Sequence, residues 1–104
     1  MADDSEEEAV RMKAQMHGLE YIPPRLIDSR RDLADLIPEW VARKGHVLPQ
    51  STNRTVLRVL MSDPLDFETM EMVRFCCGRQ IDVALASHRA IQESIDRVYG
   101  TPEL

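Results

Sequence analysis

The sequence has few of the residues on which disulfide, metal and cofactor sites depend. Its only two cysteines, Cys76 and Cys77, are adjacent, and its three histidines are scattered. Adjacent cysteines offer no disulfide framework, and on one helix they point about 100° apart, whereas zinc sites use paired ligands two to four residues apart. We therefore expect reduced thiols, no metal site and no bound cofactor.

Long apolar runs are also missing. No stretch approaches the roughly 18 to 20 apolar residues of a membrane span, and the acidic start lacks the basic and apolar regions of a secretory signal. We expect a cytoplasmic chain without direct membrane insertion. Its 104 residues provide for one domain with one modest core.

The negative charge is concentrated at the N-terminus. The formal charge is −5, and five acids lie within residues 3–8, so the rest of the chain has thirteen acids against thirteen Lys and Arg. A nearly neutral body without a basic, aromatic-studded stripe excludes nucleic-acid binding as the leading function, because such binding needs a phosphate-neutralising surface.

The pattern divides the chain into an acidic disordered tail (1–7), one α/β domain (8–99) and a C-terminal tail or truncated linker (100–104). Residues 19–24 predict an extended edge strand or loop, because the residue before a proline avoids the α region. Apolar spacing and turn residues predict helices over 8–17, 32–37, 38–43 and 67–77, a last helix capped by Ser87, and strands over 46–50, 55–61 and 81–86.

The strand over 55–61, the helix over 67–77 and the strand over 81–86 predict a βαβ unit with parallel strands. The preceding strand adds an antiparallel hairpin neighbour. The expected fold is a small two-layer α/β sandwich with a mixed sheet of three or four strands. Asp66 is the expected N-cap of the crossover helix and Gly78 its stop, and its expected apolar side is Phe67, Met70, Val73 and Cys77, with Phe75 and Cys76 nearby.

The loop Ser62-Asp63-Pro64 lies where many strand-to-helix phosphate sites lie. It has no glycine or lysine, and proline removes one backbone donor. A carboxylate pair of Asp63 and Asp66 has no neighbouring histidine or third acid to work with. We interpret the loop as a turn that launches the helix.

Two sets of apolar residues have two interpretations each. Trp40 is either a core anchor for its helix or a partly exposed partner-binding residue. Met12, Met16 and Met72 either belong to the core or line an adaptable surface.

Several segments together resemble the N-terminal domain of the secretion and pilus-assembly ATPases, which include general secretory pathway protein E and the type IV pilus extension ATPases. The segments are "LADLIPEWVARKGHVLP", "VLRVLMSDPLDFETMEMVRFCCGRQIDVALAS" and "IQESIDRVY". The resemblance covers roughly residues 8–99 and rests on five landmarks in order. It implies an α/β docking domain that connects the ATPase ring to the cytoplasmic part of an inner-membrane assembly protein.

The chain also departs from the family pattern. Leu60 stands where the family commonly has a small residue, and Cys76-Cys77 replace a more usual Leu-Thr-type pair. No Walker A or B sequence occurs, so we expect no enzyme activity from this chain. The Arg-Leu-Gly segment that binds cyclic di-GMP in some relatives is absent.

The leading hypothesis is a non-catalytic interaction domain whose partner-binding residues include Arg11, Trp40 and Arg43, the interface-type residues outside the βαβ unit. The alternative is a regulatory domain that binds a cyclic dinucleotide or another nucleotide through arginines. The candidates for that role are Arg25, Arg30, Arg31 and Arg79.

Overall fold

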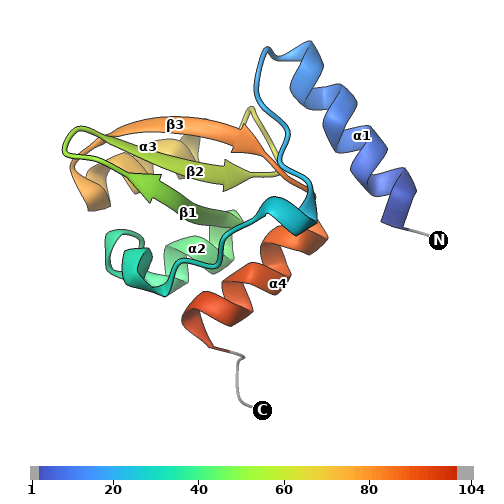
Figure 1. Cartoon of the computed structure of the whole chain (residues 1–104). Coiled ribbons are helices and arrows are strands. Elements are labelled where there is room, and N and C mark those ends of the chain that lie inside the picture. The colour runs from blue at the N-terminus through green and yellow to red at the C-terminus, as the bar shows by residue number, and fades with distance from the viewer. Residues whose placement is uncertain (1–2, 101–104) are drawn as a thin grey trace.

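The computed structural model describes residues 3–100 as a three-stranded sheet with helices packed around it (Figure 1). Among these residues, no helix is both long and apolar enough to cross a membrane. The elements in chain order are α1 (Asp3–Met16), the 3₁₀ helices η1 (Pro24–Leu26) and η2 (Arg31–Leu36), α2 (Glu39–Gly45), β1 (Val47–Thr52), β2 (Val56–Met61), α3 (Phe67–Cys77), β3 (Gln80–Leu85) and α4 (His88–Tyr99).

The sheet has the strand order β1-β2-β3 and confirms the predicted mixed α/β architecture. β1 and β2 form an antiparallel hairpin, and β2 and β3 are parallel from Val56↔Gln80 to Met61↔Leu85. A register shift after Pro49 lies in β1, where a proline is tolerated because β1 is an edge strand. The segment before the two prolines adds one parallel bridge, Tyr21↔Leu85, on the free edge of β3, as the edge-strand prediction allowed.

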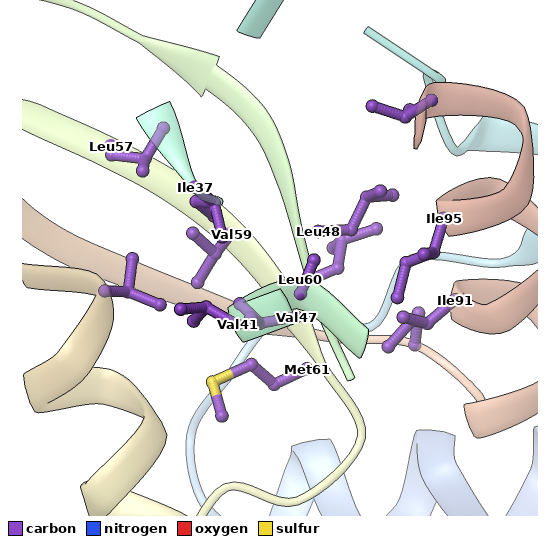
Figure 2. Packing of buried hydrophobic residues seen from close by; sticks show 14 of the residues in the cluster. Ile37, Val41, Val47, Leu48, Leu57, Val59, Leu60, Met61, Ile91 and Ile95 are labelled. Carbon is purple, nitrogen blue, oxygen red and sulfur yellow. The ribbon is translucent and has the colours of Figure 1, made fainter. Parts of the chain in front are cut away.

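The core is almost entirely aliphatic. Figure 2 shows Ile91 and Ile95 of α4 pointing toward Leu48 and Leu60 of the sheet. β2 is the central strand, and its Leu57, Val59, Leu60 and Met61 are buried, as expected for a strand covered on both faces. A second, small cluster of Val10, Ala14 and Leu85 holds α1 against β3.

Side-chain caps fix where α3 and α4 begin. Asp66 accepts a hydrogen bond from the Thr69 N–H at 3.1 Å, and Ser87 Oγ accepts one from the Ala90 N–H at 3.2 Å. Gly78 ends α3 with φ of +68°, a left-handed conformation that favours glycine. All three residues were predicted in these roles from the sequence.

One helix boundary and one helix type differ from the prediction. α1 begins at Asp3 instead of Glu8, so the described part of the acidic tail, residues 3–7, is helical. Acidic side chains in a first helical turn interact favourably with the positive end of the helix dipole, which is why an acidic run need not stay outside a helix. The expected helix over 32–37 is a 3₁₀ helix, η2, that buries Leu33.

α2 ends at Gly45, but its left-handed C-cap is the next residue, His46. His46 takes the left-handed conformation, with φ of +50°, and its N–H donates to the Ala42 carbonyl. Gly45 has a different reason to be glycine: a Cβ built there would lie 2.4 Å from Thr69 Cγ2 of α3. The glycine therefore permits α2 and α3 to approach closely.

Candidate protein-interaction surface

The loop that follows β2 is a turn and not a phosphate cradle. Asp63 Oδ1 accepts a hydrogen bond from the Leu65 N–H at 2.9 Å, and Pro64 is buried. The carboxyl group of Asp66 is occupied by the cap of α3, where it also accepts from the Thr69 hydroxyl at 2.7 Å. The two aspartates thus act on the backbone and side chain of their own loop and helix.

Three of the five aromatic residues lie outside the core. Trp40 of α2 is 59% exposed, Phe67 of α3 is 62% exposed and Phe75 of α3 is 89% exposed. We call these three residues the α2–α3 aromatic surface, because the two helices that carry them pack against each other through Gly45 and Thr69. For Trp40, the exposed alternative is the one that the structure shows.

Phe67 and Phe75 correct the predicted apolar side of α3. Val73 is buried and Met70 and Cys77, three and four residues away, are partly buried against the core. Two residues correspond to 200° around a helix, so Phe75 must point away from the sheet once Val73 faces it. The phase of the helix thus accounts for the exposed Phe75 once the structure shows Val73 on the core side.

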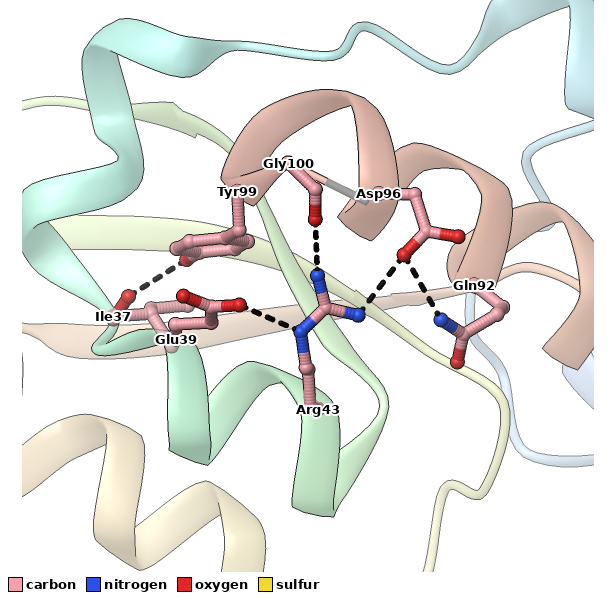
Figure 3. Close-up of polar contacts among 7 residues, drawn as sticks. All are labelled: Ile37, Glu39, Arg43, Gln92, Asp96, Tyr99 and Gly100. Atoms are coloured by element: carbon pink, nitrogen blue, oxygen red, sulfur yellow. Dashed lines mark hydrogen bonds and ion pairs between the residues drawn. The ribbon is translucent and has the colours of Figure 1, made fainter. Parts of the chain in front are cut away.

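Arg43 connects α2 to the end of α4 (Figure 3). Its guanidinium donates to Glu39 Oε2 at 2.8 Å, to Asp96 Oδ1 at 2.9 Å and to the Gly100 carbonyl at 2.5 Å. Hydrogen bonds to Glu39 and then to Asp96 raise the pKa of Arg43. The predicted partner-binding residue is thus already engaged within the chain.

Tyr99 makes a second hydrogen-bonded connection between the end of α4 and the region of α2. Its hydroxyl donates to the Ile37 carbonyl at 2.7 Å, just before α2. Burial, with a smaller contribution from the Glu39 charge, raises the pKa of Tyr99 to about 12. The phenol therefore stays protonated, and able to donate, throughout the neutral range.

Replacing Arg43 with methionine is expected to lower the free energy of unfolding by about 1 to 3 kcal/mol, because the Asp96 and Gly100 oxygens lose a charged donor. Methionine keeps most of the aliphatic stem, so the change reports mainly on the hydrogen bonds. Urea denaturation followed by circular dichroism measures it. Arg74→Met on α3 is the control, since within residues 3–100 Arg74 pairs only with Glu71 on the surface and its replacement should change stability little. Equal losses in both variants would contradict the assignment.

Arg11, the third predicted partner-binding residue, is exposed on α1. Its guanidinium donates to Glu8 one turn earlier, and this hydrogen bond raises the pKa of Arg11. Trp40 and Arg43 lie one turn apart on α2, whereas Arg11 lies on α1. Their role in partner binding stays a prediction.

Three of the four arginines considered for nucleotide binding donate to their own chain. Arg30 binds Asp32 with two hydrogen bonds, at 2.9 and 2.8 Å. Arg31 donates to the Arg97 carbonyl at 2.9 Å, and Arg79 donates to the Asn53 carbonyl at 3.0 Å. Arg25 is the remaining candidate, and the structure does not bring these four side chains to one place.

Arg25 lines a cavity of about 460 Å³ between α1, the Tyr21–Pro24 segment and α4. Arg89 lies on the same cavity, and so do Glu7 and Glu93. Glu7 accepts a hydrogen bond from the Tyr21 hydroxyl, and burial, followed by this bond, raises the pKa of Tyr21 to about 12. The cavity thus presents equal numbers of cationic and acidic side chains.

His46 and His88 stack at the junction of α2 and α4, with ring centroids 3.8 Å apart and planes tilted by 32°. Burial first, and then the charge of His88, lowers the pKa of His46, while a contact with Gln92 opposes the shift. Among residues 3–100, no three metal-ligating side chains come together. The stack therefore favours the neutral form of the His46 ring.

Acidification is expected to destabilise the protein through this pair. Because the pKa of folded His46 lies below its unfolded value near 6.5, the folded state binds fewer protons, and stability falls as the pH drops through about 6.5. Urea midpoints measured from about pH 8 to pH 5 should fall more steeply for the wild type than for His46→Asn, which removes the titration and tolerates a left-handed φ. Parallel slopes would contradict this role.

The adjacent cysteines at the end of α3 are free thiols. Cys76 is exposed, whereas Cys77 is partly buried with Sγ 3.8 Å from the Arg79 carbonyl. Neither thiol contributes to a cluster of metal-ligating groups in the described part of the chain.

Comparisons with known proteins place most of the chain in one family. The MshEN domain family matches residues 17–103, so the match starts directly after α1. The type IV pilus assembly ATPase PilB of Myxococcus xanthus (strain DK1622) is 30% identical over 87 residues, which are 84% of this chain and 15% of that protein. The chain thus spans a small part of the length of the curated relative.

Solved structures agree with this match. A structure described as "Structure of MshE with cdg" superposes with a TM-score of 0.77 at 25% identity, over 88% of this chain and 66% of that one. The N-terminal domain of XpsE superposes with a TM-score of 0.76 at 18% identity, over 88% of this chain and 65% of that one, and shows the shared fold alone. The chain therefore belongs to the MshEN domain family, the N-terminal, non-ATPase domain of type II secretion and type IV pilus ATPases.

Proposed function

We propose that this domain is a non-catalytic docking module that links a secretion or pilus-assembly ATPase to the cytoplasmic part of its inner-membrane assembly partner. Membership of the MshEN family supports the association with such systems. The observation that carries the proposal is the α2–α3 aromatic surface: the only tryptophan and both phenylalanines are exposed on a domain whose core is aliphatic.

Aromatic residues are enriched at the centre of protein interfaces, where they bury large areas and lose little side-chain freedom. An exposed Trp40 has no role in the core, since its neighbours Val41 and Ala42 supply the buried side of α2. The charged groups beside it, Arg43 and Glu39, are paired with each other. Trp40 is therefore the central candidate contact, and Arg43 supports the helix that presents it.

The test is a calorimetric binding titration of this domain with the purified cytoplasmic part of an inner-membrane assembly protein from the same organism. We expect wild-type binding, and a loss of at least about tenfold in affinity for Trp40→Ala. Leu26→Ala on η1 is the matched control, because Leu26 is equally exposed but lies away from α2 and α3. No binding by the wild type at tens of micromolar would overturn the proposal.

A second candidate function is nucleotide binding at the Arg25–Arg89 cavity. It is favoured by one observation, the superposition on MshE with cdg, the abbreviation for cyclic di-GMP, together with two arginines on a cavity large enough for a nucleotide. The two acids on the same cavity weigh against a dianionic ligand. Calorimetry with cyclic di-GMP decides: heat that disappears in Arg25→Ala supports this function, and a flat wild-type titration removes it.

A further inference from the structure

The helix α1 has a face that neither the core nor the family explains. α1 ends at Met16, and the family match begins at residue 17. Val10 and Ala14 bury one side of α1 against Leu85. Any function of the opposite, outer side of α1 must therefore be inferred from the exposed residues of α1 itself.

That outer side carries one continuous stripe of small and apolar residues. Ser5, Ala9, Met12 and Met16 recur at intervals of four, three and four, which places them on one face of a helix. All four are exposed, Met12 to 54% and Met16 to 82%. We call this set the α1 stripe.

A groove of about 410 Å³ runs along the C-terminal half of the α1 stripe. Its other wall is the turn after β2, where Leu65 is exposed and Pro64 is buried. Most of the groove surface is apolar, with Lys13 and His17 on the α1 side and Asp63 on the side of the turn. Such a groove accepts a helix that lies along α1 with its apolar side inward.

The charges of α1 are divided along its axis. All five acids of the helix precede Ala9, and Arg11 and Lys13 follow it. Lys13 makes no ion pair within residues 3–100. A helix whose acidic end lies beside Lys13 therefore complements this surface, and α1 itself has that acidic end.

We propose that the α1 stripe is a self-association surface on which α1 of a second copy lies antiparallel. A parallel pair would place acids on acids, whereas an antiparallel pair places the acidic half of each helix on the basic half of the other. A register that sets Lys13 opposite Glu6 of the second copy repeats this pair at both ends by the two-fold symmetry, since both residues flank the same side of the α1 stripe. Met12 then falls between Ser5 and Ala9 of the second copy, whose small side chains leave room for it.

The dimer is weak, because two helices of this length bury less than the roughly 1,600 Å² of a standard stable interface. Sedimentation equilibrium of the full chain, from about 10 to about 500 μM, is therefore the test. We expect the average mass of the wild type to rise toward that of a dimer. Met12→Glu should stay monomeric throughout, and Lys13→Glu should raise the dissociation constant about tenfold.

Two matched variants separate the α1 stripe from general surface effects. Phe75→Glu adds the same charge at an exposed apolar residue on α3, and Lys44→Glu reverses an exposed lysine on α2; both should dimerise like the wild type. A wild type that remains monomeric over the whole range overturns the proposal, as does a Phe75→Glu variant that dissociates as fully as Met12→Glu. If the wild type stays monomeric but binds the assembly partner, and Met12→Glu loses that binding, the α1 stripe is a surface for that partner instead.

Discussion

Leu60→Ala is expected to lower the free energy of unfolding by about 2 to 5 kcal/mol, because it opens a cavity in the centre of the sheet. Leu60 is fully buried on β2 between its strand partners Leu48 and Ala84. The small alanine opposite it cannot expand to fill the space. Urea denaturation of both proteins, followed by circular dichroism, measures the difference.

This result also bears on a departure from the family pattern, since Leu60 stands where a small residue is common. If the surrounding side chains of this chain have adapted to leucine, the small residue destabilises here. Leu65→Ala is the control, because Leu65 is exposed in the next turn and its truncation should stay within about 0.5 kcal/mol. A stable, well-packed Leu60→Ala variant would show that the leucine is not integral to the core.

Gly45→Ala is expected to destabilise the protein by about 1 to 3 kcal/mol, although alanine in a helix normally gains about 1 kcal/mol over glycine. The added Cβ would lie 2.4 Å from Thr69 Cγ2 and 2.7 Å from Thr69 Oγ1. Thr69 cannot easily turn away, because its hydroxyl donates to Asp66 at 2.7 Å and its N–H donates to the same cap. The steric conflict therefore outweighs the gain in helix propensity.

A double-mutant cycle identifies this clash as the cause. Thr69→Ala removes the two closest atoms and leaves only Cβ, at 3.1 Å, so Gly45→Ala should cost much less in that background. Gly18→Ala is the control: it meets no atom within 4 Å and is unfavourable only because φ is +68°. The changes in unfolding free energy caused by Gly18→Ala and Thr69→Ala should add in the double variant. If those of Gly45→Ala and Thr69→Ala add as well, the clash is not the cause of the Gly45→Ala destabilisation.

The elements of the fold were largely predictable because each signal is local. Asp66, Gly78 and Ser87 mark helix ends by backbone chemistry that involves residues within one turn. The strand, helix and strand from Val56 to Leu85 were also predictable, since chain connectivity leaves a parallel pair as the simple solution. The start of α1 was not, because an acidic run is compatible with either a tail or a first helical turn.

The candidate surface was less predictable than the fold. Apolar residues occur on several sides of α3, so spacing alone did not select Val73 as the buried position and leave Phe75 exposed. Trp40 had two possible environments for the same reason. A side chain's exposure depends on which neighbouring element covers it, and that information is not contained in a single helix.

The sequence by itself determined the class of fold, the positions of most helices and strands and the family, because caps, alternation and the order of landmarks are properties of short segments. Only the tertiary structure decided that Arg43 connects α2 to α4, that His46 stacks on His88 and that Gly45 serves a close helix contact. Each of these contacts joins residues far apart in the chain. Their geometry depends on how the helices pack on the sheet, which no local pattern specifies.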